Sequence, residues 1–108
     1  MTFRLTNFLF VDDVRNPPIY FPVDGTYIAR SYDEAIALLT QHNFHEVSLD
    51  HDIASYDENG KEKTGYDIAL WMAERKQNGK YVPPVVRCHS ANPVGRANIE
   101  SVIKRYLT

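Results

Sequence analysis

The chain has 108 residues, 44% of them apolar and 12% aromatic, with a formal net charge of −2. This length favours one domain over residues 1–108, and the balanced charge argues against an extensive nucleic-acid surface. The single cysteine, Cys88, excludes an internal disulfide, and no apolar run is long enough for a signal peptide or membrane span. Because one free thiol suits a reducing compartment, we expect a cytoplasmic protein without membrane contact.

The first two predicted strands flank a proline-containing loop. Residues 8–11 (FLFV) are a short apolar run that suits a strand covered on both faces, and the run stops at Asp12 and Asp13. Residues 16–18 (NPP) break regular structure, because proline lacks a donor and restricts its predecessor. The second strand is predicted over residues 26–30 (TYIAR).

A capping pattern opens the first predicted helix. Ser31 can accept a hydrogen bond from the amide of Glu34, and Glu34 can reach back to the start of the helix. The apolar face of this helix would consist of Tyr32, Ala35, Ile36 and Leu39. His42 and Asn43 end the helix, and residues 46–50 (EVSLD) are typical of a third strand.

Two further helices and a strand complete the pattern. After a polar segment with a turn at Asn59-Gly60, Thr64 can cap a helix that carries Asp67 in its first turn. A fourth strand is predicted over residues 85–88 (VVRC). The last helix would then begin with Asn92 as its cap and Pro93 at its first position, and its inner face would consist of Ile99, Val102, Ile103 and Tyr106.

Strands that alternate with helices indicate an α/β fold with a mostly parallel sheet and right-handed crossovers. We therefore predict a three-layer, receiver- or flavodoxin-like open parallel sheet, truncated to about four strands. The connection after the first strand is barely long enough for a parallel crossover. A truncated sheet also leaves an edge strand, which could pair with a second copy of the chain.

Polar and ionisable residues follow the ends of all four predicted strands. In an open parallel sheet these ends share one edge, where ligands bind near a switch point in the strand order. The coincidence of four strands predicts one site at that edge, and its residues are Asp12, Asp13, Arg30, Asp50, His51, Asp52, His89 and Ser90.

A divalent cation would relieve the repulsion among three of these carboxylates. Mg²⁺ prefers oxygen ligands, so Asp12, Asp13 and Asp50 are its predicted ligands, and another divalent ion could take its place. The alternative is that Asp13 and Asp52 are ordinary loop residues and that Asp12 is only a cap.

Histidine and arginine side chains suit the chemistry of a phosphate at this edge. His51 and His89 are candidate general acid and base, because imidazole titrates near neutrality. By contrast, His42 and His45 fall near the opposite edge of the sheet and need no functional role. Arginine can hold phosphate oxygens in bidentate fashion, and Ser90 and Asn92 precede the amide end of the last helix. The predicted phosphate-binding residues are Arg15, Arg30, Ser90, Asn92 and Arg96.

Several motifs are similar to response-regulator receiver domains, namely LFVDD, VSLD, TGYDIALWM and CHSAN. This resemblance implies that Asp12 and Asp13 bind Mg²⁺, that Asp50 is the phosphoacceptor, and that Ser90 lies beside the phosphoryl group. Receivers continue to a fifth strand with a lysine, whereas this sequence stops one strand and helix earlier. Receivers also lack the two histidines.

The set DDVRNPP, ARSYDEA, SLDHD, TGYD and HSANPVGRANIE resembles the cyclic-phosphate-processing receiver-like family across nearly the whole chain. That resemblance implies a role in processing cyclic phosphates of nucleotides or RNA ends.

The combined expectation is a metal-assisted hydrolase whose partner is a small phosphate ester, a nucleotide or an RNA end. The catalytic residues would be Asp50, His51 and His89. Two alternatives stay open: a phosphoacceptor module with Asp50 as acceptor, and a non-catalytic domain that binds a nucleotide or a protein.

Overall fold

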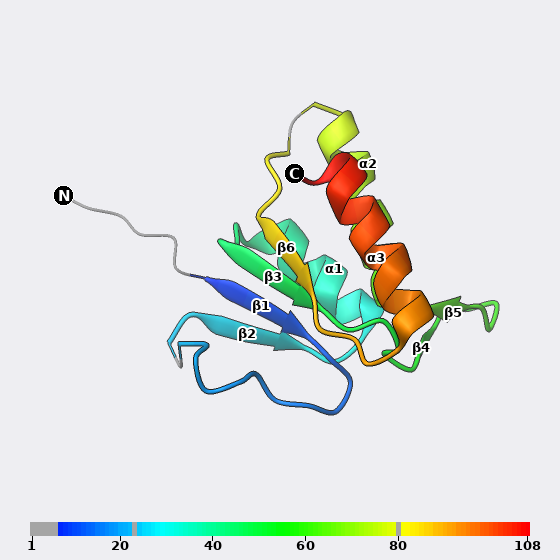
Figure 1. Ribbon diagram of the computed structural model, residues 1–108, viewed down its shortest axis with the longest axis horizontal. Coiled ribbons are helices and arrows are strands. Elements are labelled where there is room, and N and C mark those ends of the chain that lie inside the picture. The colour runs from blue at the N-terminus through cyan, green and yellow to red at the C-terminus, as the bar shows by residue number, and fades with distance from the viewer. Residues whose placement is uncertain (1–6, 23, 80) are drawn as a thin grey trace.

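A computed structural model describes residues 7–22, 24–79 and 81–108. Four strands form a parallel sheet in the order β2-β1-β3-β6 (Figure 1). They are β1 (Phe8–Val11), β2 (Thr26–Ala29), β3 (Glu46–Leu49) and β6 (Val85–Cys88). The helices are α1 (Tyr32–Gln41), α2 (Gly65–Gln77) and α3 (Pro93–Tyr106). The predicted receiver-like α/β fold with a four-stranded parallel sheet is confirmed.

The order of the strands explains where the helices lie. The connections from β2 to β3 and from β3 to β6 step across the sheet in the same direction, so right-handed crossovers place α1 and α2 on the same face. In Figure 1, α1 lies behind the sheet and α3 lies beside α2 near β6. The connection from β1 to β2 steps the other way and contains no helix within the described residues. Among the residues that the structure describes, one face of the sheet is therefore covered by helices and the other by part of this loop.

One apolar cluster joins the helical face of the sheet to all three helices. Alternate strand residues point to that face, because side chains in a strand alternate between its two sides. Phe8, Phe10 and Ser48 occupy the intervening positions and belong to the opposite face. Phe21, from the loop before β2, packs edge-on against both phenylalanines there. The helical face contributes Leu9, Val11, Ala29, Val47, Leu49 and Val86 to the cluster, together with Ala35, Leu39, Ile68, Met72, Ile99 and Val102 from the helices.

The predicted helix caps are present, with one change at α1. Ser31 accepts from the amide of Glu34, but the Glu34 carboxylate accepts from the amide of Arg30 instead of closing back onto Ser31. Thr64 and Asp67 form a complete capping box at α2. At α3, the side chain of Asn92 accepts from two amides of the first turn.

The polar segment after β3 contains a small hairpin that the sequence pattern did not predict. Strands β4 (Ser55–Tyr56) and β5 (Glu62–Lys63) pair in antiparallel fashion around the turn that Gly60 makes with a positive φ of 79°. Two-residue strands carry no alternating apolar pattern, which is why only the turn was predictable. Within the described residues, no helix has both the length and the apolar character that crossing a membrane requires.

Candidate functional site

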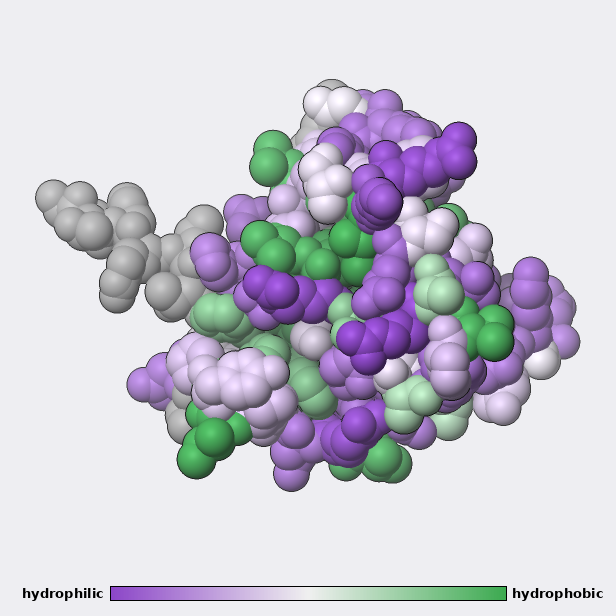
Figure 2. Space-filling view, viewed as in Figure 1, coloured by the Kyte–Doolittle hydropathy of each residue, from purple (hydrophilic) through white to green (hydrophobic). Residues whose placement is uncertain are grey.

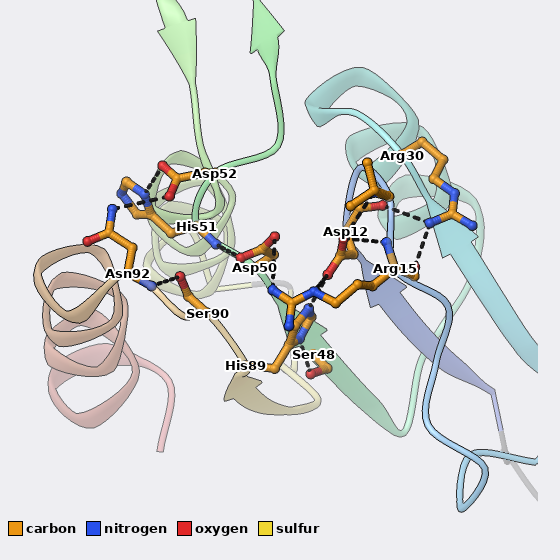
Figure 3. A network of polar contacts seen from close by, with 11 residues as sticks. Asp12, Arg15, Arg30, Ser48, Asp50, His51, Asp52, His89, Ser90 and Asn92 are labelled. Atoms are coloured by element: carbon orange, nitrogen blue, oxygen red, sulfur yellow. Dashed lines mark hydrogen bonds and ion pairs between the residues drawn. The ribbon is translucent and has the colours of Figure 1, made fainter.

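The carboxyl ends of three strands bring Asp12, Asp50 and His89 together. Val11 is paired with Leu49, and Leu49 with Cys88, so the residue that follows each strand end lies beside the next one. Each of the three side chains offers one possible ligand atom, and these atoms all lie within 4.8 Å of one another. We call these residues, with Arg15, the central cluster (Figure 3).

Asp12 is fully buried and held by four contacts. Its Oδ1 atom accepts from the amides of Val14 at 3.0 Å and Arg15 at 2.8 Å. Its Oδ2 atom lies 3.1 Å from Nε2 of His89 and 3.2 Å from Nε of Arg15. Burial opposes ionisation, but these donors outweigh it and lower the pKa of Asp12 below its ordinary value. Asp12 is therefore a fixed negative charge at neutral pH.

Asp50 directly follows β3, and its surroundings favour the charged form less than those of Asp12 do. Burial and the nearby negative charge of Asp12 raise the pKa of Asp50, although the amide of His51 donates to its Oδ1 atom at 2.8 Å. Nη2 of Arg15 lies 3.9 Å from Oδ2 of Asp50 and is the compensating cation. The central cluster thus holds two crowded carboxylates and one partly exposed guanidinium.

His89 is fixed at both ring nitrogens. Its Nε2 atom faces Asp12, and its Nδ1 atom lies 2.7 Å from the hydroxyl of Ser48. The imidazole also stacks on the ring of Phe10, with 4.4 Å between centroids and 7° between planes. Burial lowers the pKa of His89 despite the carboxylates beside it, so the ring is neutral at neutral pH.

A second polar group lies next to Asp50. Nδ1 of His51 is 2.9 Å from Oδ1 of Asp52, and the side-chain amide of Asn92 donates to Oδ2 of Asp52 at 3.2 Å. The hydrogen bond from His51 lowers the pKa of Asp52 and so keeps it ionised. We call His51, Asp52 and Asn92 the flanking group; it extends from Asp50 toward the start of α3 (Figure 3).

Two glycines allow the helices to approach this edge. A Cβ atom at Gly95 would overlap the imidazole of His51, so only glycine lets that ring lie against the first turn of α3. A Cβ atom at Gly65 would overlap the carbonyl group of Asp50. The amide of Gly65 also donates to the carbonyl of His51 at 2.9 Å. These contacts fix the backbone after β3 against α2.

The structure brings some predicted site residues together and places others elsewhere. Arg15 lies in the central cluster, whereas the guanidinium of Arg30 donates to the carbonyls of Asp12 and Arg15 and to the side chain of Asn16. Arg30 therefore braces the loop after β1. Arg96 pairs with Glu100 on α3 and has no contact with the central cluster among the described residues.

Asp13, Ser90 and Asn92, which were also predicted as site residues, lie outside the central cluster. Asp13 lies outside the group of possible metal ligands, within which His89 stands beside Asp12 and Asp50. The hydroxyl of Ser90 accepts from the amide of Asn92 and so supports the start of α3. Asn92 reaches the site only through Asp52.

Ser48 and Gly95 are site residues that the sequence reasoning missed. Strand alternation offered a signal for Ser48, because it lies two residues before Asp50 on a strand whose other residues are mostly apolar. No comparable signal pointed to Gly95, because the sequence does not show that the ring of His51 packs against the first turn of α3.

The donor set of the central cluster fits a divalent cation. Two carboxylates and an imidazole on three different strand ends are hard and borderline ligands, which suit Mg²⁺ less well than Mn²⁺ or Zn²⁺ because of the nitrogen. The contact between Ser48 and Nδ1 of His89 is the kind of outer hydrogen bond that orients a ligating histidine. Asp12, Asp50 and Nε2 of His89 would hold the ion.

Comparison with known proteins identifies the family of the chain. Searches of curated proteins and of solved structures found no match. Residues 7–105 match the family described as the cyclic-phosphate processing receiver domain. That span runs from β1 to the next-to-last residue of α3, and it contains every residue of the central cluster and the flanking group. The chain therefore belongs to the cyclic-phosphate processing receiver domain family.

Proposed function

We propose that the chain is a phosphoesterase that opens the cyclic phosphate of a nucleotide or of an RNA end. The observation that carries this proposal is the convergence of Asp12, Asp50 and His89 within 4.8 Å at the ends of β1, β3 and β6. The family description supports a substrate of the cyclic-phosphate class.

The two histidines have different roles: His51 transfers protons, and His89 helps to hold the cation. Nδ1 of His51 donates to Asp52, so Nε2 of His51 can accept a proton from the water that attacks phosphorus. Nε2 of His89 faces Asp12 at the site that would hold the cation. As the ring P–O bond breaks, the imidazole of His51 gives this proton to the departing oxygen while Asp52 holds its Nδ1 atom. The product is a phosphate monoester with a free hydroxyl.

Charge compensation comes from the same edge. Arg15 lies beside both carboxylates and can donate to phosphoryl oxygens as negative charge builds up on them. When bound, a divalent cation would polarise the phosphoryl oxygens and lower the charge of the site. Because Arg30 is committed to loop carbonyls, its contribution is to hold the loop that carries Arg15.

Substitution of the histidines tests this division of roles. His51→Gln should lower turnover of a cyclic phosphate by roughly 10²–10⁴-fold, the usual contribution of an acid–base group. His89→Gln should also lower turnover, because it removes a ligand of the cation. The control is His42→Gln, which removes a histidine at the C-cap of α1, at the opposite edge of the sheet. Circular dichroism should show that all three variants keep the fold. Unchanged rates in the first two variants would remove the histidines from the mechanism.

Metal dependence is tested separately from turnover. We expect Mn²⁺ to bind to the wild-type chain with a stoichiometry of one by titration calorimetry and binding to be lost in Asp12→Asn. Retention of full affinity in that variant would place the cation elsewhere.

A phosphoacceptor role for Asp50 is the second candidate function. The observation that favours it is the position of Asp50 directly after the inner strand β3, beside Arg15 and a possible cation site. Incubation with acetyl phosphate followed by intact-mass measurement distinguishes the two functions. A stable phosphate adduct that is absent in Asp50→Asn, without turnover of cyclic phosphates, would favour the phosphoacceptor.

A further inference from the structure

The helix-free face of the sheet contains a groove that leads toward the central cluster. Its volume is about 380 Å³. This face is turned toward the viewer in Figures 1 and 2, and Figure 2 shows hydrophilic and hydrophobic residues next to one another there. The groove is lined by Phe8, Tyr20, Phe21, Glu46, Ser48 and Arg87.

The lining is polar where a buried parallel sheet would be apolar. Parallel strands that are covered on both faces have almost entirely apolar sequences. By contrast, β3 presents Glu46 and Ser48 to this face. Glu46 forms an ion pair with Arg87 on the neighbouring strand, with 3.3 Å between Nε and Oε2. The Arg87 side chain is 66% exposed, so the pair lies at the surface and not in a core. This composition suits a polar ligand better than a packed helix.

Aromatic rings stand beside these charges. Tyr20 is 78% exposed and lies 5.3 Å from Phe21, measured between ring centroids. Phe21 in turn packs edge-on against Phe8. An exposed aromatic ring next to hydrogen-bonding groups is the usual platform for a nucleic-acid base.

Ser48 connects the groove to the central cluster. Ser48 lines the groove, and its hydroxyl lies 2.7 Å from Nδ1 of His89, whose Nε2 atom faces Asp12. Ser48 and Asp50 are two positions apart on one strand, which is about 7 Å. A ligand with its phosphate at the central cluster can therefore extend its other end into the groove.

We propose that this groove binds the base of a nucleoside cyclic phosphate. The inference rests on the proposed function, and it selects nucleoside substrates over cyclic phosphates without a base. Tyr20 would stack on the base. Glu46 would accept from ring or amino N–H groups, and Arg87 would donate to ring nitrogen or carbonyl acceptors.

Kinetics on two substrates test the groove. Tyr20→Ala and Arg87→Ala should each raise KM for a nucleoside cyclic phosphate by roughly 10-fold, the scale of one lost stacking or base contact, with little change in kcat. Neither variant should change KM for the corresponding ribose cyclic phosphate that lacks a base. The matched control is Arg105→Ala, which removes the same charge from the exposed last turn of α3 and should change neither constant.

A binding measurement separates this inference from the proposed function. A nucleoside monophosphate titrated into labelled protein should shift the amide resonances of Glu46 and Arg87, and the shifts should weaken in Tyr20→Ala. That result without turnover of any cyclic phosphate would support the groove and refute the phosphoesterase. Equal KM values for the two substrates in the wild type would refute the groove and leave the phosphoesterase standing. A dimer that Tyr20→Ala dissociates, with nucleotide binding unchanged, would also refute it.

Discussion

Removing the charge of Asp50 should stabilise the metal-free protein. Asp50 and Asp12 offer oxygen atoms that lie within 4.8 Å of each other. At that separation, repulsion between two full charges is about 1 kcal/mol in water and about 3–4 kcal/mol at an effective dielectric constant of about 20. Arg15 offsets part of it, but its side chain is 54% exposed and its nitrogen lies 3.9 Å from Asp50.

Asparagine at this position keeps the geometry while it removes the charge. The side-chain oxygen of the Asp50→Asn variant could still accept from the amide of His51, so no buried donor loses its partner. We expect Asp50→Asn to raise the free energy of unfolding by about 1 kcal/mol, or to raise Tm by about 4 °C, in buffer with EDTA. Asp24→Asn, which removes the same charge from an exposed loop position, should have almost no effect.

The stability gained by Asp50→Asn should depend on pH in a defined direction. The pKa of Asp50 is raised in the folded state, so ionisation above the ordinary value of 3.8 destabilises the fold. The advantage of asparagine should therefore be full at neutral pH and vanish as the pH falls below 3.8. Urea denaturation at several pH values measures it. Equal or lower stability of Asp50→Asn at neutral pH would refute the idea that the two carboxylates are held together at an energetic cost.

Three further results are expected. The pKa of Asp12 is lowered in the folded state, so its contribution to stability should be lost as the pH falls below 3.8, and urea denaturation should show this loss in the wild type but not in Asp12→Ala. Gly95→Ala should destabilise the protein because its Cβ overlaps His51, and unfolding measurements should show no such penalty in a His51→Ala background. Thr64→Ala should lower the free energy of unfolding by about 1 kcal/mol through loss of the cap of α2, whereas Thr40→Ala on the exposed side of α1 should cost much less.

The sequence was most informative about elements with a local signal. The apolar run that forms β1 and the caps at Ser31, Thr64 and Asn92 depend on neighbours within a few residues, and the structure confirms them. The hairpin of β4 and β5 escaped prediction because its strands are too short for a repeating pattern.

Side-chain direction at the strand ends was harder to predict. Asp12 and Asp13 are adjacent, and only Asp12 turns into the group that also contains His89. Likewise, nothing local distinguishes an arginine that faces a ligand from Arg30, which donates to loop carbonyls. Such choices depend on the strand register and on packing between distant segments, neither of which is visible in one sequence.

The contact between Asp12 and His89 joins residues 77 positions apart. Closing a loop of that length costs entropy, so this contact depends on the packing that holds β1, β3 and β6 side by side. A ligand that binds both residues would therefore stabilise the folded arrangement of most of the chain. Its binding should slow hydrogen exchange throughout the sheet, and at a hundredfold excess over Kd it would add about 2.7 kcal/mol to global stability.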